Sequence, residues 1–223
     1  MSIGDDTMKQ NYQIILDNTL DEITQSGSHP SLLLHACCAP CSSYVLEYLN
    51  KYFDITVFFY NPNITSKEEY DRRSEEIKRL INDLPQEREI KLMFGKYDPE
   101  RFFEISKGLE DMPEGGERCF KCYRQRLTET ANAARDGGFD FFTTTLSISP
   151  HKNAQKLNEI GAELAKETGV SYLFSDFKKR NGYKRSCELS AIYGLYRQDY
   201  CGCVWSKKAR YKQKEMEKDV DTA

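Results

Sequence analysis

Cysteine is the residue type in this sequence that points most clearly to a chemical function. The chain has eight cysteines in 223 residues, and seven of them stand in three short groups. The groups are Cys37, Cys38 and Cys41, then Cys119 and Cys122, and last Cys201 and Cys203. Closely spaced thiols are typical of metal ligands or redox pairs, and these groups predict such a role. Cys187 stands alone and fits the other reading, a small buried hydrophobic residue.

The expected compartment strengthens that prediction. The first ten residues, MSIGDDTMKQ, are polar and lack the apolar segment of a signal peptide. The longest apolar runs, such as residues 55–60, are far shorter than the ~20 residues of a membrane-spanning helix. We therefore expect a cytoplasmic protein without a membrane partner. Because thiols stay reduced there, clustered cysteines indicate metal or redox chemistry and not structural disulfides.

The type of metal is open from the residues alone. Cys119 and Cys122 form a C-x-x-C motif, which suits zinc, a redox dithiol or an iron–sulfur cluster. The adjacent pair Cys37-Cys38 is an unusual zinc knuckle, so four thiolates from the two groups favour a [4Fe–4S] cluster, with zinc as the alternative. His35 is available nearby, but we interpret it as a strand-end residue.

The third group, Cys201-Gly202-Cys203, has a different chemistry. A C-x-C pair can close into a small, strained disulfide, and strain makes such a bond labile and suited to electron transfer. Gly202 provides the backbone freedom that the tight ring needs. The alternative is a pair of unbonded thiols in a turn.

The elements that must position these groups alternate between strands and helices. Apolar positions at helical spacing predict an N-terminal helix over residues 12–23. Buried strands are expected at residues 31–36, 55–60, 89–94, 139–146 and 170–174, with helical patterns between them. This alternation predicts an α/β fold with a parallel sheet and flanking helices. The first cysteine group follows the first strand, where α/β proteins bind ligands, and precedes a helix whose N-terminus favours thiolates.

The charge distribution indicates a nucleic-acid partner more than the net charge does. The chain carries −3 overall, yet residues 178–212 hold ten Lys and Arg against two acidic residues, an excess of +8. We expect residues 178–185 to form a loop, residues 188–196 a short helix, and the basic segment to continue toward the C-terminus as a helix. Such a segment suits phosphate binding, although a solvated basic helix is the alternative. The candidate RNA-binding residues are Lys179, Arg180, Lys184 and Arg185.

Four motifs together resemble one known family. LHACCAPCSS, ERCFKCYRQRL, TTTLSISPHKN and DYCGCVWS occur in the order and spacing of the cobalamin-independent epoxyqueuosine reductases, the QueH family. The resemblance runs from about residue 32 to about residue 211. It implies the last step of queuosine biosynthesis, the two-electron reduction of epoxyqueuosine to queuosine at the wobble position of tRNAs with a GUN anticodon. It also implies a HUP-type fold similar to ATP pyrophosphatases, and an electron donor that the sequence leaves unidentified.

The resemblance assigns roles to particular cysteines. It implies that a [4Fe–4S] cluster is held by Cys37, Cys38, Cys119 and Cys122, and that Cys201 and Cys203 form a redox-active disulfide. Some relatives have an aspartate in place of Cys41, near a second metal, so an additional mononuclear iron at Cys41 stays open. The expected division is a helical extension over residues 1–30, the α/β catalytic domain with its iron–sulfur site over 31–212, and a polar tail over 213–223.

Two other functions remain as alternatives. An ATP-pyrophosphatase-like enzyme that thiolates tRNA needs a Ser-Gly-Gly-x-Asp-Ser loop after the first strand, so that phosphate can approach the backbone. Residues 37–42 read Cys-Cys-Ala-Pro-Cys-Ser and contain no glycine, which argues against it. A non-catalytic, zinc-stabilised RNA-binding module is the other alternative.

Overall fold

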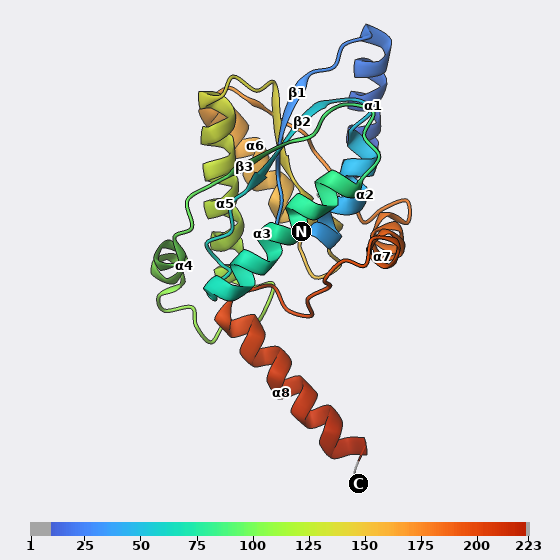
Figure 1. Cartoon of the computed structure of the whole chain (residues 1–223). Helices are drawn as coiled ribbons and strands as arrows, with labels where there is room; N and C mark the ends of the chain where they lie inside the picture. Colours follow the sequence, from blue (N-terminus) through green and yellow to red (C-terminus); the bar gives the residue numbers. More distant parts are fainter. Residues whose placement is uncertain (1–9, 222–223) are drawn as a thin grey trace, which may run out of the picture.

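A five-stranded parallel sheet forms the centre of the computed structural model, which describes residues 10–221 (Figure 1). The strand order is β3-β2-β1-β4-β5, and all neighbouring pairs are parallel. The strands are β1 (Ser31–His35), β2 (Asp54–Phe59), β3 (Lys91–Phe94), β4 (Phe141–Thr144) and β5 (Ser171–Tyr172). The predicted α/β class is confirmed, and the arrangement is consistent with the HUP-type fold.

Helices cover both faces of the sheet. They are α1 (Tyr12–Ser26), α2 (Ala39–Leu49), α3 (Lys67–Asp83), α4 (Pro99–Ser106), α5 (Glu117–Asp136), α6 (Ala154–Thr168), α7 (Gly182–Ile192) and α8 (Val204–Asp221), with a 3-10 turn, η1 (Thr145–Ile148). Side chains alternate between the faces of a strand. Leu32 and Leu34 of β1 therefore join the core under α1, α2 and α3, whereas Leu33 joins the core under α5 and α6.

Local signals in the sequence account for several helix starts. The Ser66 side chain accepts a hydrogen bond from the backbone N–H of Glu69 and caps α3, which confirms one half of the capping box. The Glu69 carboxylate binds Arg73 instead of reaching back to the cap. Pro99 occupies the first turn of α4, where its missing N–H costs nothing.

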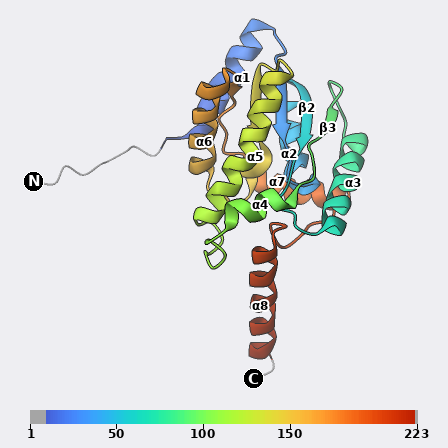
Figure 2. The same cartoon turned by 90° about the vertical axis from the view of Figure 1, so that its left-hand side faces the viewer.

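The C-terminal part differs from its sequence-based description in two ways. Helix α7 begins at Gly182, so half of the expected loop 178–185 is helical, and it ends at Ile192 instead of continuing to residue 196. The predicted basic helix is confirmed as α8, which extends from the body (Figures 1 and 2) and continues past residue 212. Residues 1–9 of the predicted extension and residues 222–223 of the predicted tail lie outside the described residues.

The helices were compared with the length and hydrophobicity of a membrane span. Over residues 10–221, none is both long and apolar enough to cross a bilayer.

Candidate metal and redox site

The site lies where the strand order reverses, between β1 and β4. In open parallel sheets, this point leaves a crevice at the carboxyl ends of the strands. His35 ends β1 there, and its ring bonds Thr144 Oγ1 at 2.8 Å and the Tyr60 carbonyl at 3.0 Å. Both ring nitrogens are thus engaged, and burial lowers the pKa of His35 to about 3. The interpretation of His35 as a strand-end residue is confirmed.

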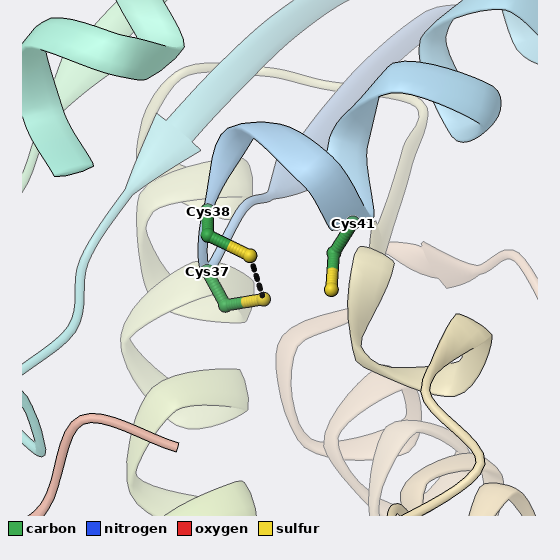
Figure 3. Close-up of side chains that lie close together, drawn as sticks. All are labelled: Cys37, Cys38 and Cys41. Carbon is green, nitrogen blue, oxygen red and sulfur yellow. Dashed lines mark hydrogen bonds between the residues drawn. The ribbon is translucent and has the colours of Figure 1, made fainter. Parts of the chain in front are cut away.

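The first cysteine group forms a compact set of three thiols (Figure 3). The sulfur atoms of Cys37, Cys38 and Cys41 lie within 4.8 Å of one another, and those of Cys37 and Cys38 are 3.6 Å apart. Cys38 is the N-cap residue of α2 and Cys41 lies in its first turn, as expected. Hydrogen bonds with Cys37 and Cys41 hold the pKa of Cys38 well below its usual value. Hydrogen bonds with Cys37 and Cys38 raise the pKa of Cys41 well above its usual value. The group can therefore carry thiolate charge and bind a metal ion.

The second cysteine group lies in the first two turns of α5. The Cys119 sulfur accepts a hydrogen bond from the backbone N–H of Gly115 at 3.4 Å. Cys122 is 5% exposed, and burial raises its pKa to about 12. A buried thiol of this kind loses its proton when a metal binds it, so metal affinity and proton release are coupled here.

The third cysteine group is held by side chains of α3 and of the loop after β2, which bind its backbone. The carbonyl of Cys201 accepts hydrogen bonds from Arg73 Nη1 at 3.2 Å and from Asn63 Nδ2 at 3.4 Å. Gly202 has a φ of 113°, a backbone conformation that favours glycine. Cys203 is 6% exposed, and burial raises its pKa. All eight cysteines are free thiols in this structure.

Two adjoining cavities connect the three groups. A small one, ≈ 20 Å³, is lined by four cysteines of the second and third groups: Cys119, Cys122, Cys201 and Cys203. A larger one, ≈ 590 Å³, is lined by Cys37, Cys41 and Cys201. Arg126, Lys152 and Cys201 line both cavities, so they stand at the junction.

Buried cations surround the thiols. Arg73 is 2% exposed and pairs with Glu69 at 2.6 Å, while Lys152 is 8% exposed and pairs with Glu114 at 2.8 Å. Arg126 is 1% exposed, and its Nη2 atom has no hydrogen-bond partner among the described residues. Burial works against the charge of Arg126, yet the thiols of Cys122, Cys201 and Cys37 raise its pKa above the usual value. This environment suits an anionic, thiolate-bound group.

Comparison with known proteins agrees with this architecture. The family model described as "Epoxyqueuosine reductase QueH" matches residues 32–209. The chain belongs to the QueH family. A Staphylococcus epidermidis protein named epoxyqueuosine reductase QueH is 42% identical over 217 residues, 95% of this chain and 91% of that protein. Proteins of the same name from Streptococcus pyogenes serotype M1 and Thermotoga maritima are 43% identical (90% of this chain, 79% of that protein) and 35% identical (79% and 90%).

Six of the seven grouped cysteines of this QueH chain line the two cavities, and Cys38 lies beside Cys37, but the seven do not form one set. Among the described residues, Cys37, Cys38 and Cys41 alone meet the geometry of a shared single-ion site, and Cys119 and Cys122 lie outside it. Thiolates that bind separate irons of a cluster lie farther apart than the ligands of one ion. The spacing of the cysteines is therefore compatible with a single metal ion at Cys37, Cys38 and Cys41 and also with a cluster that has ligands from two groups. Cys187 lies apart on α7 and lines neither cavity.

Sequence reasoning missed the buried cations of the site. The signal was present, because Arg118, Cys122 and Arg126 are spaced four apart and share the buried face of α5. Lys152 lies within the motif TTTLSISPHKN, but the motif alone does not indicate that this lysine is buried beside the thiols. A buried charged residue on the same helix face as a buried cysteine is a candidate for a functional site.

The predicted RNA-binding residues divide into two kinds. Arg180 forms an ion pair with Asp17 of α1, and Arg185 binds Glu47 of α2 through two contacts of 2.9 and 2.6 Å. Lys179 and Lys184 are exposed, and no ion pair involves them within residues 10–221. The lysines are therefore free to meet phosphate groups, whereas the arginines are already partly neutralised.

Proposed function

We propose that this protein reduces epoxyqueuosine in tRNA to queuosine, the reaction for which its relatives are named. One observation carries the proposal. Three thiol groups from distant segments converge on a crevice at the sheet switch point, together with a buried and unpaired guanidinium. Thiol groups of this number and spacing suit electron transfer better than acid–base or phosphate chemistry.

A [4Fe–4S] cluster bound by Cys37, Cys38, Cys119 and Cys122 fits the residues present. The donors are all thiols, the preferred ligands of such clusters. The Nη2 atom of Arg126 has no hydrogen-bond partner within residues 10–221, and an anionic occupant of the site would supply one. When bound, the cluster would supply one-electron transfer, and a separate iron with an open position would polarise the epoxide oxygen. An additional mononuclear iron near Cys41 remains part of the proposal, because Cys41 completes the three-thiol set.

Cys201 and Cys203 would supply the two electrons. Opening the epoxide to the alkene breaks both carbon–oxygen bonds and consumes two electrons and two protons, and the oxygen leaves as water. Oxidation of the two thiols to a disulfide releases two electrons and two protons, so the step balances. Cys201 lines both cavities and is half-buried, which favours it over Cys203 as the thiol nearer the substrate. A cellular reductant must then restore the dithiol.

The larger cavity offers room for the modified nucleoside. Its walls include Tyr183 and Tyr200, rings on which a base can stack, and its rim includes Arg210 of α8. Lys179, Lys184, Arg180 and Arg185 are the proposed contacts to the tRNA backbone. Asp199 stands next to the C-x-C pair in the sequence and could in principle deliver a proton, but it binds Arg210 at 3.2 Å and Lys214 at 2.5 Å. Lys214 holds the pKa of Asp199 below its usual value, so that carboxyl is a poor acid.

The two alternatives make different demands. The thiolating enzyme needs a glycine-rich phosphate loop after β1, where this chain has Cys37 to Ser42. The zinc-stabilised module needs no redox pair, so the loss of Cys201 would leave it unaffected.

Reduction of the tRNA nucleoside tests the function directly. Anaerobically purified protein is incubated with epoxyqueuosine-containing tRNA and a chemical reductant, and the digested nucleosides are analysed by mass spectrometry. We expect conversion to queuosine, with brown, iron-containing protein. Cys187→Ser is the matched control, since it removes a thiol that lines neither cavity. Colourless protein with one zinc and no conversion would refute the proposal.

A further inference from the structure

Arg126 and Arg118 are the two buried cations around the thiols that have no carboxylate partner among the described residues, and Arg126 is the one that thiols from three segments influence. Its Nε atom lies 3.5 Å from the Cys122 carbonyl and its Nη1 atom 3.4 Å from Asn61 Oδ1, while Nη2 has no partner among the described residues. Within residues 10–221 it forms no ion pair with a carboxylate. An unpaired charge buried in a protein interior is strongly unfavourable. Some negative group must therefore compensate it in the working protein.

The neighbouring cations show what compensation looks like here. Arg73 pairs with Glu69, and Lys152 pairs with Glu114. Arg118 donates to two backbone carbonyls at 3.0 and 2.7 Å and lies over the Trp205 ring. The groups that do most to raise the pKa of Arg126 are thiols from three segments: Cys122, Cys201 and Cys37.

We infer that Arg126 is the counter-charge of the thiolate-bound metal centre and raises the reduction potential of that centre. The inference rests on the proposed function, because it concerns the metal that the thiols would hold. Reduction adds one negative charge to the centre. A fixed positive charge at short range in a poorly hydrated interior stabilises the reduced form more than the oxidised form. Arg126 is a positioning and tuning residue and not a catalytic one.

The test compares three variants in the holoprotein without tRNA. Arg126→Gln removes the charge and keeps much of the shape, whereas Arg126→Lys keeps the charge. Arg124→Gln is the matched control, because Arg124 lies on the same helix but is 44% exposed and paired with Glu163. Iron content and circular dichroism are measured first. The midpoint potential then follows from anaerobic redox titration monitored by visible absorption and electron paramagnetic resonance.

We expect Arg126→Gln to disfavour reduction at least tenfold, which for a one-electron centre is a fall of about 59 mV. Arg126→Lys and Arg124→Gln should stay close to the wild-type potential. If Arg126→Gln stays folded but loses iron while Arg126→Lys keeps it, the counter-charge role is supported by metal content instead.

Several results would overturn the inference. An unchanged potential in iron-loaded Arg126→Gln would do so, as would loss of iron from both Arg126 variants, since shape and not charge would then be required. Neither result touches the proposed function, which depends on a loaded and active wild-type protein. Wild-type protein that binds no iron would refute the inference and the proposed cofactor together.

Discussion

Removing Lys179 and Lys184 should flatten the salt dependence of tRNA binding. Both lysines are exposed and have no ion-pair partner in the described part of the chain, so each can neutralise one phosphate. Each phosphate contact contributes about −0.7 to −0.9 to the slope of log K against log salt. The Lys179→Ala/Lys184→Ala variant should therefore have a slope smaller by about 1.4 to 1.8. Between 50 and 200 mM salt, this difference corresponds to roughly 7- to 12-fold less loss of affinity.

A charge-neutral variant provides the control. Lys78→Ala/Glu75→Ala deletes both members of an exposed ion pair on α3, away from the proposed tRNA contacts, so the net charge of the surface is unchanged. We expect the wild-type slope from this variant, measured by fluorescence anisotropy with labelled tRNA over a salt series. The reasoning is refuted if the charge-neutral variant flattens the slope as much as the lysine variant does. It is equally refuted if the lysine variant keeps the wild-type slope, because the tRNA then binds elsewhere.

Three further outcomes are expected. Cys203→Ser should keep the iron spectrum and tRNA affinity but lose multiple turnover with a thiol reductant; full turnover, or loss of iron, would contradict the proposed redox pair. Cys119→Ser should lose iron and colour while circular dichroism shows an intact fold, and iron at the Cys187→Ser level would show that Cys119 is not a ligand. Gly182→Ala should destabilise the protein by about 1–3 kcal/mol or more in urea unfolding, because its Cβ would lie 1.9 Å from the Phe177 carbonyl oxygen; a wild-type midpoint would mean that the start of α7 can shift.

The limits of sequence reasoning are clearest around α7. The spacing of apolar residues correctly predicts the elements in the first part of the chain, because β1, β2 and α3 bury regularly spaced side chains in the core. The run KKRNGYKR has no such stripe, so it was expected to be a loop, yet α7 begins inside it at Gly182. Two contacts fix the start of α7. The Gly182 N–H donates a hydrogen bond to the Lys179 carbonyl, and Tyr44 of α2 packs so closely on Gly182 that a larger residue would not fit. Tertiary contacts override weak local preference at such a position.

The sequence by itself determined the order of strands and helices, the position of the first cysteines after β1, and membership of the QueH family. These are properties of local pattern, because periodicity and short motifs are written in neighbouring residues. Only the tertiary structure decided which charges are free. Arg180 and Arg185 find carboxylates 163 and 138 positions away, while Arg126 finds none within the described residues. Charge compensation depends on distance in space, and the folded chain alone sets that distance.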